Sequence, residues 1–493
     1  MSSILSWHEN SGVSVDWSTG VGGLGRMTLP MGLTFDLQTG LDAQSRMRPW
    51  LVIQHILHSE QDWLNFIEYL AAPYDPKHDT PQSKPWAYKR VQQRGITTPW
   101  TDEFAEITVE MGNETWHNGL VDEWLGFSMR GSVMQGGKEY GLFTRYICET
   151  MRRSPYWQSE KLDQKIRISL GANYDGRVDK DNAVRGYGEE AMQANPYATI
   201  LGHANYVGPK WETGDYSARN YDDHGVQECL VGFLAGPEQS QMHMQEARDV
   251  LAKTGHAYDI CAYEGGPGGY SVWNISAEQK EVNERYGKSL AMAVGAMDTW
   301  MRSYQYGWTY QDFLGYGQGF YWNSHTGMGN GFRPTPGWLT LALRNRYASG
   351  DLVRVTENRL PTYARRYTKN KKEMSDTLPL IGAYAMRDGA KYSVFVVSRK
   401  LDGPHDGVDF GDGYSPVTLH LPFARAGKVT LHTLTGNPRQ TNRDAMNIDI
   451  QSKELPATVV NSGSLAVNEQ SGGGKNGMPP GSIYLYVFEN TTN

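Results

Sequence analysis

The sequence predicts an α/β fold: a (β/α)8 barrel over residues 1–352, followed by an antiparallel β-sandwich over residues 353–493. In the first part, short apolar runs that suit buried strands alternate with stretches of helical spacing. Two of these runs end in glycines beside a carboxylate, at a separation that fits strands of a barrel. After residue 353, short runs recur between turn signals, which is typical of a sandwich. A chain of 493 residues is long enough for both domains.

The first clear strand–helix unit begins at Trp50. Residues 1–49 are rich in glycine and carry little periodic pattern, whereas Trp50–Gln54 is an apolar run that predicts a strand. A helix is expected to begin after Ser59. The Ser59 hydroxyl can cap the first turn, and the Asp62 side chain, three residues later, can bond back to the Ser59 amide. Apolar residues follow at helical spacing until Pro73 ends the helix.

The stretch from Phe104 to Trp116 carries the first candidate for chemistry. Phe104–Met111 is an apolar, β-branched run that predicts a buried strand, and Gly112 ends it. Asn113, Glu114 and Trp116 follow at once. A glutamate can protonate a glycosidic oxygen, an amide can hold a ring hydroxyl, and an indole can stack on a sugar ring. The alternative is a strand that ends in a polar loop with a surface glutamate.

A second carboxylate stands in the same setting. Tyr258–Tyr263 is another strand-like run, and Glu264 follows it directly. Residues 265–269 hold four glycines and a proline, which predicts a sharp turn that leaves the carboxylate at the strand end. Glu264 follows Glu114 by 150 residues, which leaves room for about three further units at roughly 40 residues per strand–helix unit. Retaining glycosidases need two such carboxyls about 5 Å apart.

The two motifs, Gly112-Asn113-Glu114-Thr115-Trp116 and Tyr263-Glu264-Gly265-Gly266, resemble clan A of the retaining glycoside hydrolases. In that clan the glutamate after asparagine on strand 4 is the acid/base, and a glutamate that ends strand 7 is the nucleophile. The resemblance runs from about Trp50 to the C-terminus. It points to the branch of arabinofuranosidases and β-xylosidases, whose barrels carry a C-terminal β-sandwich. It implies Glu114 as acid/base, Glu264 as nucleophile, and an Asn113 that holds the 2-hydroxyl.

Further candidates for substrate contact come from the other predicted strand ends. His203 and Tyr206 lie in the strand-like run 198–206 and are expected to face the mouth of the barrel. Tyr206 resembles the clan A tyrosine that hydrogen-bonds the nucleophile, whereas His203 has a buried structural histidine as its alternative. The candidates for stacking on sugar rings are Trp116, Trp124, Trp273 and Trp322. Trp322 belongs to the expected eighth strand, residues 317–323, and core packing is its alternative.

The remaining elements complete the predicted order. Another strand is expected at residues 165–170, and helices are expected at residues 140–151, 239–254, 277–304 and 336–347. In the sandwich, strands are expected at residues 381–386, 392–398, 417–421, 429–434 and 483–488.

The short N-terminal part bears on both fold and function. If Trp50–Gln54 is the third barrel strand, as the resemblance implies, only 49 residues precede it, and two strand–helix units need about 30 residues each or more. The barrel is then compressed at its start or lacks an N-terminal piece. This keeps open a non-catalytic carbohydrate-binding or assembly protein on a barrel without its N-terminal part. An inverting or phosphorolytic sugar enzyme is a third alternative.

The composition of the chain limits the classes of partner that are expected. The net charge of −7 argues against nucleic acid, and no apolar run is long enough to span a membrane. The high aromatic content of 12 % suits either a sugar-binding groove or an aromatic core. The three cysteines, Cys148, Cys229 and Cys261, form neither a disulfide framework nor a zinc motif, so no metal or cofactor is expected. A saccharide is the expected partner, and a homo-oligomer is compatible with the chain. No signal peptide is seen, which leaves a cytoplasmic location or, with an incomplete N-terminus, a secreted one.

Overall fold

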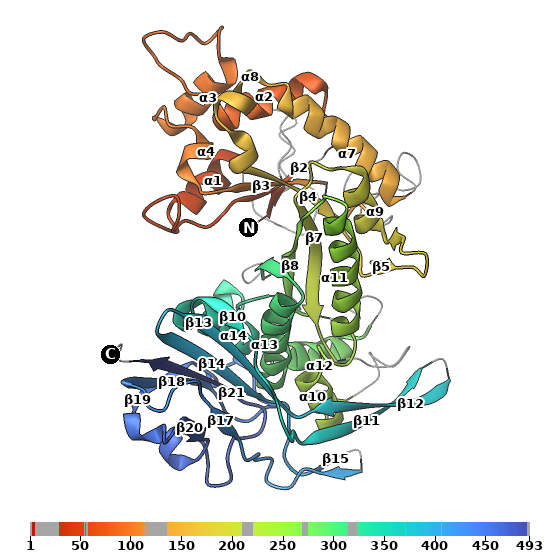
Figure 1. Ribbon diagram of the computed structural model, residues 1–493, viewed down its shortest axis with the longest axis vertical. Helices are drawn as coiled ribbons and strands as arrows, with labels where there is room; N and C mark the ends of the chain where they lie inside the picture. The colour runs from red at the N-terminus through yellow and green to blue at the C-terminus, as the bar shows by residue number, and fades with distance from the viewer. Residues whose placement is uncertain are drawn as a thin grey trace. The chain divides into compact units, whose positions relative to one another are not determined.

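The structure is a computed structural model (Figure 1). Its residues form two compact units. The described residues are 2–4, 29–53, 55, 58–112, 114–116, 136–209, 220–268, 275–313, 323–369, 371–405 and 407–490. Unit 1 comprises Met1–Ala204, Ser240–Tyr263 and Gly307–Asp312, and unit 2 comprises Asn205–Gln239, Glu264–Tyr306 and Phe313–Asn493. These units do not divide the chain at residue 352, and the domain boundary predicted there stays a prediction.

Unit 1 is built on a seven-stranded sheet whose strands follow one another in chain order. They are β1 (Ser2–Ile4), β2 (Trp50–Ile53), β3 (Ile107–Met111), β4 (Ile166–Gly171), β7 (Ile200–Val207), β8 (Asp259–Pro267) and β9 (Trp308–Gln311). β1 to β4, β4 with β7, and β8 with β9 pair in parallel. Every residue of β2 and β3 is buried, which explains their continuous apolar runs. The predicted α/β class with parallel strands is therefore confirmed.

The helices of the first part lie between these strands. They are α1 (Leu29–Leu37), α2 (Glu60–Ala71), α3 (Pro85–Arg94), α4 (Trp100–Glu103), α7 (Gly137–Arg152), α8 (Pro155–Ser159), α9 (Tyr187–Ala194) and α11 (Pro237–Lys253). The capping box predicted from Ser59 and Asp62 is present at the start of α2. A short hairpin, β5 (Arg177–Val178) with β6 (Val184–Arg185), precedes α9. Among the residues that the structure describes, no helix is both long and apolar enough to cross a bilayer.

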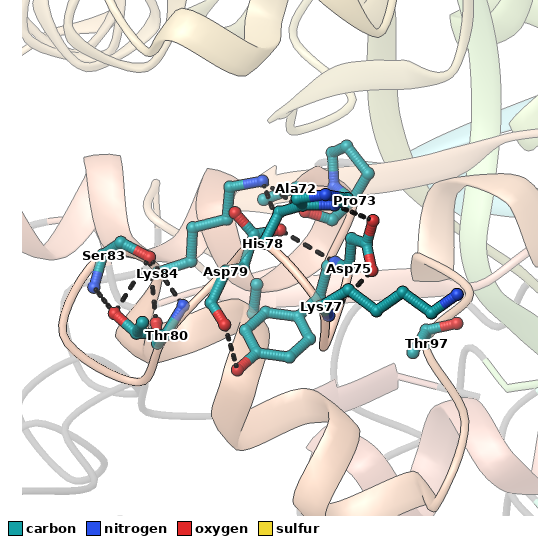
Figure 2. Close-up of polar contacts among 12 residues, drawn as sticks. Ala72, Pro73, Asp75, Lys77, His78, Asp79, Thr80, Ser83, Lys84 and Thr97 are labelled. Carbon is teal, nitrogen blue, oxygen red and sulfur yellow. Dashed lines mark hydrogen bonds and ion pairs between the residues drawn. The ribbon is translucent and has the colours of Figure 1, made fainter.

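The connection between α2 and α3 is closed by its own polar side chains (Figure 2). The Asp79 carboxylate accepts hydrogen bonds from the Asp75 amide at 2.8 Å and from Lys84 Nζ at 2.9 Å. Lys84 Nζ also donates to the Pro73 carbonyl at 2.8 Å, and His78 Nδ1 lies 2.6 Å from the Asp75 carboxylate. These polar groups pair with one another within the connection, so we assign the connection a structural role.

Unit 2 is built on a six-stranded antiparallel sheet with the order β10-β13-β14-β21-β18-β19. The strands are β10 (Asp351–Val353), β13 (Ile381–Asp388), β14 (Lys391–Ser398), β18 (Lys428–Leu434), β19 (Gln451–Leu455) and β21 (Ile483–Glu489). Two separate two-stranded sheets accompany it: β17 (Thr418–His420) with β20 (Ser464–Ala466), and the hairpin of β11 (Thr362–Lys369) with β12 (Lys372–Pro379). A further pair is β15 (Pro404–His405) with β16 (Val408–Asp409). The antiparallel strands predicted for the C-terminal part are confirmed, and their arrangement as a β-sandwich stays a prediction.

Both faces of the central strands of the six-stranded sheet, β14 and β21, are buried. Phe395 and Leu485 belong to one core cluster, together with residues of α10 (Asp223–Leu230), α13 (Leu290–Gln305) and α14 (Pro336–Tyr347). Their strand neighbours Val396 and Tyr486 belong to a second cluster, together with residues of β17 and β20. Because adjacent strand residues point to opposite faces, this arrangement requires nearly unbroken apolar strands. One face thus packs on helices, and these helices belong to unit 2 for that reason.

Two of the expected elements differ in the structure. The single helix predicted over residues 277–304 is two helices, α12 (Ala277–Gly287) and α13, because Ser289 caps a new helix through the Met292 amide. The strand that neighbours β8 is β9 at Trp308–Gln311, ahead of the stretch predicted as the eighth strand. Residues 317–322 of that stretch lie outside the described residues.

Candidate active site

A sharp turn at the carboxyl end of β3 carries Glu114. Gly112 has φ +81° and Glu114 has φ +46°, so both lie in the left-handed region. The Gly112 amide donates to the Ile53 carbonyl of β2 at 2.7 Å. A Cβ on Gly112 would lie 2.5 Å from His55 Nδ1, so glycine is the residue that fits. The half-buried Glu114 side chain is therefore held at the end of the sheet by a backbone turn that tolerates little change.

Tyr263 of β8 contacts this glutamate. Its hydroxyl donates a hydrogen bond to Glu114 Oε1 at 3.2 Å, and its side chain is buried. The sequence placed Tyr263 at the end of a strand-like run and in the motif of Glu264, but it did not predict this contact. The available signal was its position directly before Glu264. The contact brings the segment before Glu264 onto the acid/base candidate from β3.

Aromatic packing fixes the rest of the turn. The Trp116 ring lies against β4, since a Cβ on Gly171 would approach its Cζ3 to 2.7 Å. The Tyr140 hydroxyl of α7 donates to the Met111 carbonyl at 2.6 Å and accepts from the Gly171 amide at 3.3 Å. Trp116 is 9 % exposed. The structure thus places the Trp116 ring mainly in the packing beneath the turn, and its role as a sugar platform stays a prediction.

His55, just after β2, is a second neighbour that the sequence analysis missed. It is almost fully buried, and its ring centroid lies 5.5 Å from that of Tyr140. Burial lowers the pKa of His55 to about 3, with a smaller contribution from His58, so the ring is neutral at ordinary pH. It lies in contact range of Gly112 and therefore supports the turn that carries Glu114.

Glu264 lies within β8 and is half-buried. The glycines after it were predicted to turn the chain at once, but the strand continues to Pro267. They permit close packing instead: a Cβ on Gly266 would lie 2.9 Å from the Phe313 ring. A Cβ on Gly268 would lie 2.8 Å from Tyr206 Cβ, so Tyr206 packs beside the end of β8. The expected bond from Tyr206 to the nucleophile stays a prediction.

His203 of β7 lies in the core. It is 2 % exposed, and its ring centroid lies 3.7 Å from that of Tyr174 and 5.6 Å from that of Trp308. Burial lowers the pKa of His203 to about 4. This environment favours the structural alternative for His203, and its sugar contact remains untested. Asn113, Trp124, Trp273 and Trp322 lie outside the described residues, so their assigned roles also stay predictions.

Comparison with known proteins gives the fold but no sequence relative. No protein-family model matches the chain, and no curated protein sequence matches it. Among solved structures, a family 51 arabinofuranosidase from Xanthomonas axonopodis pv. citri has a TM-score of 0.59 at 12 % identity, over 90 % of this chain and 76 % of that one. A family 51 α-L-arabinofuranosidase from Bifidobacterium longum also has 0.59 at 12 % identity, over 94 % and 79 %.

A third structure has a different catalytic specificity. A family 44 xyloglucanase from Paenibacillus polymyxa has a TM-score of 0.53 at 9 % identity, over 94 % of this chain and 83 % of that one. The chain therefore has the fold of these glycoside hydrolases over nearly its whole length. That agrees with the clan to which the two glutamate motifs point.

Proposed function

We propose that this protein is a retaining glycoside hydrolase that acts on an oligo- or polysaccharide, with Glu114 as acid/base and Glu264 as nucleophile. The observation that carries the proposal is the hydrogen bond from Tyr263 to Glu114 Oε1, because it brings β8, the strand that carries Glu264, against the turn that carries Glu114. Two glutamates from β3 and β8 of a parallel sheet suit the double displacement that retaining glycosidases use. The fold shared with the arabinofuranosidases and the xyloglucanase supports the same class.

The reaction would proceed in two steps. In the first, a Glu264 carboxylate oxygen bonds to the anomeric carbon, the glycosidic bond breaks, and the Glu114 proton passes to the leaving oxygen. In the second, a water oxygen bonds to the anomeric carbon and gives a proton to Glu114, while the ester bond to Glu264 breaks. Asn113 would hold the 2-hydroxyl, where a hydrogen bond strengthens as positive charge develops on the sugar. Neither step requires a metal.

We further propose that the parallel strands belong to a (β/α)8 barrel. Seven strands in chain order and the match to the family 51 fold support it. In such a barrel the carboxyl ends of all strands share one rim, which is where β3 and β8 carry their glutamates. Arabinofuranosides and xyloglucan are the first substrates to test, because the similar structures are named for them.

The test is hydrolysis by two variants. Glu114→Gln and Glu264→Gln should each lose at least about a thousandfold in kcat/KM with unchanged thermal unfolding, since each removes a group that reacts. Glu246→Gln, at an exposed position on α11, is the matched control and should retain full activity. An activated 2-fluoro glycoside should label Glu264, which peptide mass spectrometry detects. Full activity in either variant would remove that residue from the mechanism, and binding of glycans without release of sugar would favour the non-catalytic alternative.

A further inference from the structure

The hydrogen bond between Tyr263 and Glu114 carries an inference that rests on the proposed function and deepens it. We propose that Tyr263 is a positioning residue, which holds Glu114 through Oε1 and favours its ionised form. The donor is the phenol hydroxyl of Tyr263, and it donates a hydrogen bond to the Glu114 carboxylate at 3.2 Å.

The geometry on the Tyr263 side is rigid. The side chain is 7 % exposed and comes from the middle of β8, which runs from Asp259 to Pro267. Two positions earlier, the Cys261 thiol lies 3.2 Å from the Thr309 hydroxyl of β9, so the strand is fixed against its neighbour. A hydroxyl on such a strand can hold the Glu114 carboxylate in one orientation, because the Tyr263 side chain loses little conformational freedom when the hydrogen bond forms.

The backbone conformation of Glu114 also needs support from its surroundings. Glu114 has φ +46°, a conformation that costs a non-glycine residue about 1–3 kcal/mol and persists only where the surroundings fix it. His55 against Gly112 fixes the backbone before Glu114, and Tyr263 fixes the carboxylate itself. The backbone and the side chain of the acid/base are therefore held by separate segments, the residues just after β2 and strand β8.

The chemistry follows from the charge. A hydrogen bond donated to a carboxylate is stronger than one donated to a neutral carboxyl group, so the Tyr263 hydroxyl stabilises ionised Glu114 more than protonated Glu114. Ionised Glu114 is the form that takes a proton from water in the second step. Tyr263 therefore sets the pH above which Glu114 is ionised and can no longer protonate the leaving oxygen in the first step.

The central experiment compares Tyr263→Phe with wild type. The variant keeps the ring and removes only the donor. The basic limb of its kcat/KM profile should move up by about one pH unit, because Glu114 then holds its proton more tightly. On 2,4-dinitrophenyl glycosides, whose leaving group needs no acid, the basic limb should not shift, because formation of the ester then does not use the Glu114 proton.

Tyr258→Phe is the matched control. Tyr258 lies just before the same strand and is 6 % exposed, and its hydroxyl has no hydrogen-bond partner in the described part of the chain. Both variants lose one buried hydroxyl, but only one loses a bond to Glu114. The pH profile of Tyr258→Phe should match wild type. A Tyr263→Phe variant that behaves like this control would overturn the inference.

A second readout does not depend on activity. In protein labelled with 13C at the glutamate side-chain carboxyl, the Glu114 signal is identified by its loss in Glu114→Gln, and its titration is followed by NMR. The midpoint should rise by about one unit in Tyr263→Phe, and an unchanged midpoint counts against the inference. If the wild type hydrolyses no glycoside, the proposed function fails, and this titration still decides the role of Tyr263.

Discussion

At the scale of single residues, Gly112 is the position that the Glu114 turn tolerates least. It combines a φ of +81° with a contact to His55, because a Cβ there would lie 2.5 Å from the ring and 2.8 Å from Thr115 Cγ2. Gly112→Ala should lower the free energy of unfolding by about 1–3 kcal/mol and should lower kcat further by displacing Glu114. Urea unfolding and steady-state kinetics check both effects.

Gly95→Ala separates the two causes. Gly95 has a similar φ of +72°, but no atom lies within 4 Å of the Cβ that alanine would add. This control therefore carries the backbone strain without the clash. Equal losses of stability in the two variants, with normal kcat in both, would show that the contact with His55 does not matter.

The buried histidines predict how stability responds to acid. The pKa of His55 is lowered to about 3 and that of His203 to about 4, from 6.5 in the unfolded chain, chiefly by burial. Between pH 6.5 and these values the unfolded chain binds protons that the folded protein does not, so stability should fall as the pH falls through this window. Thermal unfolding from pH 7 to pH 4 measures the slope. His55→Leu should reduce it, whereas His420→Leu, at an exposed position on β17, should leave it nearly unchanged.

At the scale of elements, the first turn of α9 predicts a response to base. Glu189 is fully buried, and its carboxyl lies against Gly176 and Gly186, whose added Cβ atoms would fall within 2.0 and 2.4 Å of its oxygens. Burial raises the pKa of Glu189 from 4.5 to about 8. From pH 4.5 to 8 the folded protein keeps a proton that the unfolded chain has lost, so stability falls as the pH rises and stays low above pH 8.

Glu189→Gln tests this response. The variant should be more stable than wild type at pH 8, by on the order of a few kcal/mol, and similar to it at pH 4. Urea midpoints at the two pH values measure the difference. Glu190→Gln, one position further along α9 and half-buried, should keep the wild-type slope. The assignment to Glu189 would fail if both variants behaved alike.

A buried ion pair joins helix to sheet in unit 2. Asp298 of α13 accepts from Arg399 Nε at 2.7 Å and from Nη2 at 2.8 Å, and the Tyr384 hydroxyl of β13 donates to it at 2.5 Å. Asp298 and Arg399 are both fully buried. Asp298→Asn leaves the guanidinium without its counter-charge and should lower the free energy of unfolding by about 3–5 kcal/mol. Glu149→Gln removes the exposed pair with Arg145 and should have no measurable effect, so chemical unfolding of both variants gives the contrast.

At the scale of the whole molecule, the strands were the part that the sequence predicted well. The apolar runs at 50–54, 104–111, 165–170, 198–206 and 258–263 all contain strands of the parallel sheet, because strands buried on both faces leave a continuous apolar signal. The antiparallel C-terminal sheet was recognised from its short runs in the same way. The α/β class follows from local pattern alone.

The environment of Glu114 could not be predicted in the same way. Tyr263 and His55 reach the turn because of the register and curvature of distant strands, which leave no mark in local composition. The glycines after Glu264 were taken for a turn signal, but close packing by Phe313 and Tyr206 is an equally good reason for small residues. The grouping of α10, α13 and α14 with the C-terminal sheet likewise depends on long-range packing.

That grouping predicts the behaviour of an isolated C-terminal segment. Residues 353–493 alone would expose Tyr384, Phe395 and Leu485, which pack on α13 and its neighbours in the intact chain. We expect such a segment to bind a hydrophobic dye, to aggregate, and to lack a cooperative thermal transition. Supplying residues 1–352 as a separate chain should restore the transition. A cooperative melt of the segment by itself would show that the sheet does not need its helical face.

The two-sided burial of the sheet also constrains protein engineering. A chimaera that exchanges only the stretch after residue 352 with a homologous enzyme would pack a foreign sheet against the native helices. The mismatched contacts would then lie inside a hydrophobic core. A viable graft has to transplant α10, α12, α13 and α14 along with the strands. The set of segments that has to be exchanged together is therefore discontinuous in sequence.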